Sequence, residues 1–251
     1  MAETLDRDLE KIFRWGNDWL ITFNERKTRL LSLSRSRDDS FPSINFGSTT
    51  LPEISDLRLL GPDIASNGSW EKYILSIAKS ASMRVGCLYR AKQFLHPEAI
   101  LYLYKATIRP LMEYCSHIWG GASASHLALL DRVQKRIINL VGEELGSSLQ
   151  TLSHRRSVAT LSLFYRYFHG KCSSSLFSLV PPVRKFERAT RLSASSHSYT
   201  LDVPRCRTRS YTNSFIPRAA SLWNSLPSGC FPSSYDLASF KRNINSCLLY
   251  S

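Results

Sequence analysis

The sequence lacks the cysteine and apolar patterns that mark several classes of protein. Its six cysteines are scattered, and no C-x-x-C pair occurs among Cys87, Cys115, Cys172, Cys206, Cys230 and Cys247. This excludes a zinc ribbon and a disulfide-rich secreted domain, because both need closely spaced cysteines. His169 and Cys172 come nearest to a metal cluster, but no second pair at ligand spacing accompanies them. We therefore expect reduced thiols and no bound metal or other cofactor.

Long apolar runs are also missing. No run reaches about 18 residues, so we expect no membrane-spanning helix. The first 13 residues, MAETLDRDLEKIF, are charged and amphipathic, unlike a signal peptide. These features predict an intracellular protein, cytoplasmic or nuclear, that is not secreted.

Motifs of a self-contained active site are absent as well. The sequence contains no G-x-x-x-x-G-K-[ST], no G-x-G-x-x-G and no G-x-S-x-G. Asp38-Asp39, the one adjacent Asp pair, follows a Ser/Arg run, and we interpret it as a solvated loop rather than a metal site. We interpret Cys115-Ser116-His117 as a core cysteine near a half-exposed histidine rather than a catalytic dyad. The sequence therefore predicts no enzyme in its own right.

Acidic residues are scarce relative to basic ones. The chain has 33 Lys and Arg against 20 Asp and Glu, a formal charge of +13, and 43% of its 251 residues are hydrophobic. Such an excess on a chain able to form a core indicates a polyanionic partner. Nucleic acid is favoured over an anionic membrane, since no predicted helix combines a basic face with a broad apolar one.

Several basic clusters are candidate contacts to a nucleic-acid backbone, with solvated surfaces in salt bridges as the alternative for any one of them. The candidates are Arg84, Arg90, Lys92, Arg132, Lys135, Arg136, Arg155, Arg156, Arg184, Lys185, Arg188, Arg191, Arg205, Arg207 and Arg209. We expect sequence-independent binding of RNA or DNA, and the oligomeric state stays open.

Hydrophobic spacing predicts a mainly α protein with a small N-terminal α+β unit. We expect a helix over residues 4–19, two short strands around a turn at 24–26, a hairpin with Gly47 in its turn, and a strand stopped by Gly61-Pro62. Helices should follow from residue 69, from Pro97 to Gly120 with a kink or restart at Pro110, from Ser123, and from Ser148 to Gly170. Short connections between them indicate a helical bundle.

The C-terminal part differs in composition. Residues 181–218 are basic and Ser-rich, which predicts an extended or loosely ordered segment. A short helix over RAASLWNSLP and a final helix from about Ser234, opened by a Ser233-x-x-Asp236 capping box, should follow. We thus expect three segments: 1–65, 66–170 and 171–251.

The order of several motifs points to a known family. They are WGNDWLITFNERKT (15–28), LRLLGPDI (57–64), LYKATIRPLMEYCSHIWG (103–120), LLDRVQKR (129–136), HRRSVATLSLFY (154–165), FIPRAASLWNSLP (215–227) and SFK (239–241). This series resembles the C-terminal part of the reverse transcriptase of LINE-type, jockey-like non-LTR retrotransposons. The resemblance covers nearly the whole chain.

The resemblance implies a role for each segment. Residues 1–65 correspond to the edge of the polymerase palm, 66–170 to a thumb-like helical bundle, and 171–251 to a basic C-terminal region. Lys27 matches the lysine near the incoming triphosphate, and Leu60, Gly61 and Asp63 match the primer grip. Gly61-Pro62-Asp63-Ile64 departs from the family pattern there, since the proline removes a backbone donor.

The resemblance also implies what the chain does not do. The family's Ala-Asp-Asp aspartates, which bind Mg²⁺, are expected before residue 1, so this chain has no catalytic residues for phosphoryl transfer. We expect a catalytically incomplete fragment of an RNA-directed DNA polymerase that at most binds template-primer nucleic acid. The alternative is a non-enzymatic helical module, used by the host to bind RNA or protein.

Overall fold

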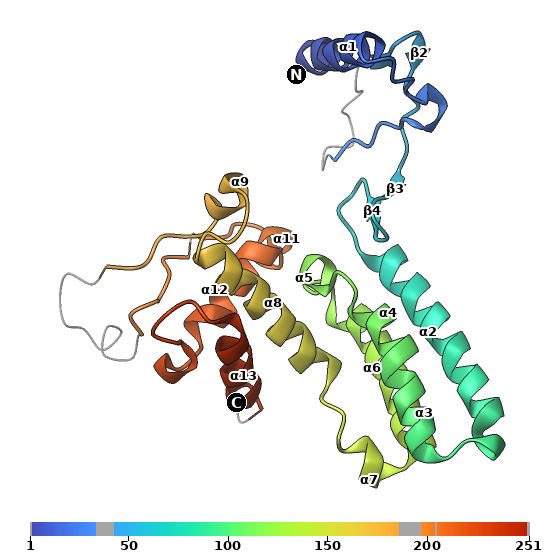
Figure 1. Ribbon diagram of the computed structural model, residues 1–251, viewed down its shortest axis with the longest axis vertical. Coiled ribbons are helices and arrows are strands. Elements are labelled where there is room, and N and C mark those ends of the chain that lie inside the picture. Colours follow the sequence, from blue (N-terminus) through green and yellow to red (C-terminus); the bar gives the residue numbers. More distant parts are fainter. Residues whose placement is uncertain (1, 34–42, 186–196, 204, 250–251) are drawn as a thin grey trace. The chain divides into compact units, whose positions relative to one another are not determined.

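The computed structural model describes residues 2–33, 43–185, 197–203 and 205–249. It separates into two compact units, Met1–Tyr73 and Ile74–Ser251. The described residues are mainly helical, with two small antiparallel sheets in the first unit (Figure 1). The predicted fold class, mainly α with a small N-terminal α+β unit, is confirmed at this level.

A short hairpin and one helix form the core of the first unit. Helix α1 (Ala2–Asp18) packs against β1 (Asn45–Phe46), which pairs with β2 (Thr49–Thr50). Gly47 lies in the turn with φ +60°, as the sequence predicts, because glycine adopts this conformation without strain. The core consists of Ile44, Phe46 and Leu51 packed against Leu9, Phe13, Phe23 and Leu30.

One face at the C-terminal end of α1, continuing into the residue after it, exposes two large aromatic side chains. The side chain of Trp15 is 50% exposed and that of Trp19 is 69% exposed. The two rings lie 6.5 Å apart. Since large apolar side chains normally lie inside, this face is an unusual surface of the first unit.

The two strands predicted around Asn24 are wrong. Residues there form a 3-10 turn, η1 (Glu25–Lys27), because the Asn24 side chain accepts a hydrogen bond from the Lys27 N–H at 3.2 Å. Leu30 forms only an isolated bridge with Glu53.

The strand predicted before Gly61 is one arm of a hairpin. β3 (Asp56–Arg58) pairs with β4 (Asp63–Ala65) in antiparallel register. Leu60 and Gly61 lie in the connecting turn with φ of +51° and +114°. An ion pair at 2.8 Å links Lys72, in the first turn of the next helix, to Asp56 of this hairpin.

The helices of the second unit follow the predicted apolar spacing. α2 (Glu71–Ala91) continues into η2 (Lys92–Phe94), and α3 (Pro97–Leu103) begins with Pro97 at a favoured first-turn position. α6 (Ala124–Val141) is capped by Ser123, as expected, and α7 (Glu143–Gly146) leads to α8 (Leu152–Phe168). α8 begins four residues later than predicted because Thr151 accepts the His154 N–H and acts as the cap. Every helix in the described part of the chain is too short or too polar to cross a membrane.

The segment after α3 is broken into short pieces. A π-helical turn, η3 (Tyr104–Ile108), joins α3 to α4 (Arg109–Glu113), in which Pro110 occupies the first turn. Cys115 then takes a left-handed conformation with φ +53° before α5 (Ser116–Trp119). The sequence predicts a kink or restart at Pro110 and a helix that continues to Gly120. The second prediction is wrong, because the chain breaks at Cys115.

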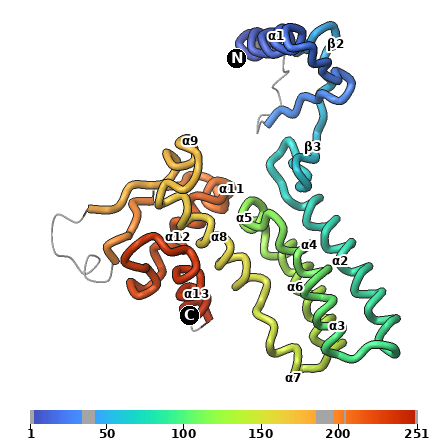
Figure 2. The backbone as a smooth tube through the Cα atoms, viewed as in Figure 1, coloured from blue at the N-terminus to red at the C-terminus, as the bar shows by residue number. Residues whose placement is uncertain are grey.

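The C-terminal residues return to α8 and form one core with it. After α9 (Ser174–Phe177), they include α11 (Arg209–Thr212), α12 (Phe215–Asn224), η4 (Ser228–Cys230) and α13 (Leu237–Cys247). Both α12 and α13 pack on α8, and Figure 2 shows the backbone folding back onto this helix. Because the core extends across residue 170, the structure has no boundary there between a bundle and a separate C-terminal segment.

Part of the segment 181–218 is better ordered than predicted. Val183 and Leu201 form an antiparallel bridge, and Asn224 bonds to both backbone groups of Leu201 at 2.8 and 2.9 Å. His197, Thr200 and Leu201 are buried. The final helix is capped by Asp236, which accepts the N–H groups of Ala238 and Ser239, rather than by a box beginning at Ser233.

Trp223 lies at the centre of this core. Its side chain is fully buried and contacts the rings of Phe164, Phe168, Phe231 and Phe240. The indole N–H donates to the carbonyl of Tyr199 at 2.8 Å. The ring therefore joins α8, α12 and α13 and satisfies its one polar group.

Replacing Trp223 with alanine should lower the free energy of unfolding of the second unit by about 3–5 kcal/mol. The substitution leaves a cavity and removes the hydrogen bond to the Tyr199 carbonyl. Urea denaturation followed by far-ultraviolet circular dichroism measures the loss. Trp19→Ala, at an exposed tryptophan, is the matched control and should change the value by less than about 0.5 kcal/mol. Equal losses in the two variants would contradict the central position of Trp223.

His197 makes this core sensitive to acid. Its Nδ1 accepts the Tyr199 N–H at 3.2 Å, so the proton lies on Nε2, which donates to the Trp223 carbonyl at 3.2 Å. Burial lowers the pKa of His197, against an opposing contribution from the bond to Trp223. The unfolded chain therefore takes up a proton at higher pH than the folded protein does.

The stability conferred by neutral His197 should be complete above pH 6.5 and decrease as the pH falls toward 5. Urea midpoints at pH 7, 6 and 5 test this, with His197→Gln expected to have a shallower pH dependence than the unmodified chain. His96→Gln, at an exposed histidine, serves as the control and should keep the full slope. An unchanged slope in His197→Gln would show that other groups cause the acid sensitivity.

Candidate nucleic-acid interface

A groove between α2 and α6 brings two predicted basic residues together. Its volume is about 460 Å³, and it is lined by Val85, Tyr89, Lys92, Arg136, Asn139 and Leu140. Lys92 directly follows α2, whereas Arg136 and Asn139 are three residues apart on α6 and so share a face of that helix. The sequence separates the two cations by more than forty residues, and the fold places them on one groove.

The groove combines an apolar base with a polar rim. Val85 is 2% exposed and Leu140 is 8% exposed, so both belong to the packed interior. Tyr89 is 67% exposed and presents its ring at the rim. Lys92 and Arg136 are exposed, and no Asp or Glu is among the described residues that line the groove. The groove therefore carries positive charge without a neutralising carboxylate and offers an aromatic face beside it.

Other predicted cations extend this surface along both helices. Arg132, one turn before Arg136, and Lys135, directly before it, are exposed on α6, and Arg84 and Arg90 are exposed on α2. The Arg84 guanidinium donates to the carbonyl of Thr107, which holds it against the chain between α3 and α4. Arg90 lies 3.3 Å from Cys87 Sγ. The two helices thus carry exposed cations on both sides of the groove.

Arg155 and Arg156 do not belong to this surface. Arg155 donates to both oxygens of Glu113, with 2.9 Å from Nη2 to Oε2, and this hydrogen bonding raises the pKa of Arg155. Arg156 is 5% exposed. Predicting Arg156 as a surface contact is therefore wrong, and Arg155 already has a carboxylate partner.

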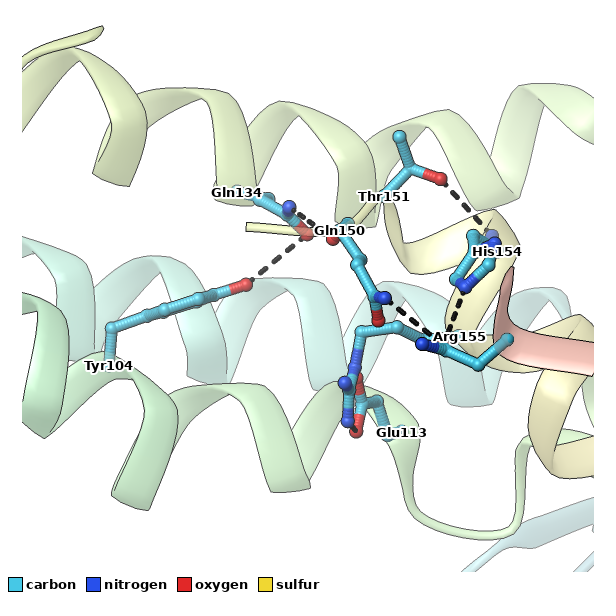
Figure 3. A network of polar contacts seen from close by, with 8 residues as sticks. Tyr104, Glu113, Gln134, Gln150, Thr151, His154 and Arg155 are labelled. Carbon is cyan, nitrogen blue, oxygen red and sulfur yellow. Dashed lines mark hydrogen bonds and ion pairs between the residues drawn. The ribbon is translucent and has the colours of Figure 1, made fainter. Parts of the chain in front are cut away.

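A polar network connects α6 with α8 and α13 (Figure 3). Tyr104 Oη donates to Gln134 Oε1 at 3.3 Å, and Gln134 Nε2 donates to the Gln150 carbonyl at 2.9 Å. Gln150 Nε2 and His154 Nε2 both meet Asn245 Oδ1, at 3.0 and 2.9 Å. Burial strongly raises the pKa of Tyr104, so its phenol is neutral at pH 7. The network fixes the position of α6, the helix that carries Arg136.

The basic residues near the C-terminus lie elsewhere in the second unit. Lys185, Arg205, Arg207 and Arg209 are exposed, and Arg184 forms an exposed ion pair with Asp202 at 3.2 Å. None of them lines the groove. Arg188 and Arg191 lie outside the described residues, as do Asp38 and Asp39.

The residues singled out by the resemblance lie in the first unit. Lys27 is exposed at the end of η1. Leu60 is 86% exposed and shares the turn of the β3–β4 hairpin with Gly61, whereas Asp63 is half-buried at the start of β4. The turn is closed by a hydrogen bond from the Leu59 N–H to the Pro62 carbonyl at 2.9 Å.

Of Cys115-Ser116-His117, Cys115 lies in the bend between α4 and α5, and Ser116 and His117 begin α5. Cys115 is the left-handed residue, and the His117 ring packs against Phe215 at 5.9 Å. Burial, and secondarily the charge of Arg218, lowers the pKa of His117. In the part of the chain that the structure describes, no three His, Cys, Asp or Glu side chains gather into a group able to hold a metal ion.

Sequence reasoning missed Tyr89 and Asn139 as members of the groove. Each had a usable signal, since Tyr89 is adjacent to Arg90 and four residues after Val85, and Asn139 follows Arg136 by three residues. What the sequence did not contain was the pairing of α2 with α6. A comparison of the chain with models of protein families, with curated proteins and with solved structures finds no match.

Proposed function

We propose that this chain is a non-enzymatic nucleic-acid-binding protein that contacts the sugar–phosphate backbone through the groove between α2 and α6. The observation that carries the proposal is the shared groove of Lys92 and Arg136, with no carboxylate among the described residues that line it. Cations in such a groove attract phosphates and release the counterions condensed on nucleic acid. The formal charge of +13 supports the same class of partner.

The groove suits a single strand in particular. Tyr89 is 67% exposed at its rim, so an unpaired base has a ring on which to stack while its phosphate meets Lys92 or Arg136. Stacking on an aromatic ring and backbone contacts both tolerate any base. We therefore expect binding of RNA or DNA without sequence preference, in an intracellular compartment.

The motif series in the sequence supports an origin from the reverse transcriptase of a LINE-type, jockey-like retrotransposon. On this proposal the first unit derives from the palm edge and the helices of the second unit derive from the thumb and C-terminal region. The sequence contains no Ala-Asp-Asp. The described residues do not fit the family's magnesium site either, because they include no cluster of carboxylates able to hold a metal ion.

A second function, binding of a protein partner, is favoured by one observation. The exposed Trp15, on α1, and Trp19, directly after this helix, form a small apolar face. Faces of this kind mark interaction surfaces in many soluble proteins. A saturable protein or sequence-selective RNA target would favour this alternative, in which the host uses the chain as a binding module.

Replacing Lys92 and Arg136 together with glutamine should weaken binding of a single-stranded oligonucleotide and lower the slope of log affinity against log salt by about 1.4–1.8, since two phosphate contacts are lost. Filter binding between 50 and 300 mM NaCl measures both quantities. Lys11→Gln with Arg14→Gln is the matched control, because it removes the same charge from exposed positions on α1. Equal effects in the two double variants, or no binding at 50 mM salt, would contradict the proposed interface.

The purified chain should not extend a primer on an RNA or DNA template with either Mg²⁺ or Mn²⁺. The reason is that the sequence lacks the family's Ala-Asp-Asp motif, whose aspartates hold the metal ions for phosphoryl transfer. A primer-extension gel with all four deoxynucleotides provides the measurement, and an active reverse transcriptase is the positive control. Template-dependent incorporation of deoxynucleotides by the pure chain would refute the proposal that the chain is not an enzyme.

A further inference from the structure

A buried arginine of α8, Arg156, and a half-buried arginine of α12, Arg218, lie where α8 contacts both α5 and α12. Arg156 and Thr160 lie one turn apart on α8 and are 5% and 0% exposed. Arg218, on α12, donates from Nη2 to the carbonyl of His117 in α5 at 2.9 Å. The two guanidinium groups are close enough to interact, because burial, and secondarily the charge of Arg156, lowers the pKa of Arg218.

Three polar atoms of these side chains have no partner. Arg156 Nη1, Thr160 Oγ1 and Arg218 Nε are buried and make no hydrogen bond with any described residue. Buried polar groups in native proteins are almost always paired, and those of charged groups are the costliest to leave unpaired. The two guanidinium N–H donors and the hydroxyl in this junction therefore need a hydrogen-bond acceptor.

The nearby carboxylates do not supply it. Both oxygens of Glu113 are taken by Arg155. Asp131 is exposed on α6 and attracts Arg156 only at longer range, so burial remains the main influence and lowers the pKa of Arg156. Since Arg155 is paired with Glu113 and Asp131 is exposed, Arg156 and Arg218 bring two positive charges to the junction without a carboxylate bonded to either.

Arg156 and Thr160, which carry two of the unpartnered atoms, share one face of α8 because they are four residues apart. Phe164, one turn after Thr160, packs edge-on against Phe215 of α12 at 6.4 Å, and Phe215 packs against His117 of α5 at 5.9 Å. The face of α8 formed by Arg156, Thr160 and Phe164 therefore points at α5 and α12. A side chain at Gly120 would lie 3.1 Å from Arg218 Nη1, so glycine at this position lets the guanidinium approach α5.

We propose that the junction of α5, α8 and α12 binds a tetrahedral oxyanion of the phosphate or sulfate type, held by Arg156, Arg218 and the hydroxyl of Thr160. A dianion matches the two positive charges and supplies acceptors for all three orphaned groups. The site is separate from the groove, since it shares none of the residues that line it. Its occupant joins three helices of the second unit and is a structural ligand.

The test measures the thermal unfolding of the full chain in inorganic phosphate and in NaCl of equal ionic strength. At 100 times its Kd, phosphate should raise Tm by about 5–10 °C above the chloride value, because it binds only the folded protein. Arg156→Met and Arg218→Met should abolish this rise. Arg166→Met removes the same charge from an exposed position on α8 and should retain it.

Equilibrium dialysis of the unmodified chain with radiolabelled phosphate keeps the test decisive if the variants fail to fold. One saturable site per chain, competed by sulfate but not by chloride, supports the proposal. Competition by a 5′-phosphorylated oligonucleotide would identify the phosphate of a nucleic acid as the source, and its absence would identify the free anion. No saturable uptake, or a rise in Tm that persists in both Met variants, would overturn the site.

Discussion

The second unit depends on the burial of α8 from opposite sides. Helices α4, α5 and α6 contact it, and α12 and α13 pack against it as well. Its apolar residues Leu161, Phe164 and Tyr165 are therefore almost completely inside. A helix covered in this way has little surface left for charged side chains, so a cation on its covered faces must find a partner within the protein, whereas Arg166 is exposed. Arg155 finds Glu113, whereas Arg156 finds no carboxylate of its own.

The cations behind the charge of +13 consequently lie in different environments. Some cations are neutralised in pairs, such as Arg155 with Glu113 and Arg184 with Asp202. Lys92 and Arg136 are exposed in a groove and remain available to a polyanion. The total charge suggests a polyanionic partner, but the fold is needed to distinguish exposed cations from those already paired within the protein.

Much of the helical framework could be predicted from apolar spacing. Leu130, Val133 and Ile137 recur at three- and four-residue intervals, and α6 extends over the predicted residues. Spacing fails where a local hydrogen bond or an unusual backbone angle decides the structure. Asn24 forms a turn by capping Lys27, and Cys115 takes a positive φ that no propensity for a cysteine would predict.

The same contrast applies to the candidate sites. Lys92 and Arg136 are recognisable as basic residues, but their shared groove depends on the pairing of α2 with α6. Arg156 was taken for a surface residue because arginine is seldom buried. Yet it falls four residues after Leu152 and four before Thr160, both of which are inside, so helical spacing already placed it on the inner face.

These two kinds of cation should respond differently to salt. Exposed Lys92 and Arg136 are screened by dissolved ions, so their attraction for a polyanion weakens steadily as salt rises. Arg156 is shielded from the solvent, and an oxyanion beside it would be screened much less. Occupancy of the proposed junction site should therefore depend on the identity of the anion rather than on the ionic strength, unlike the proposed binding of a polyanion in the groove.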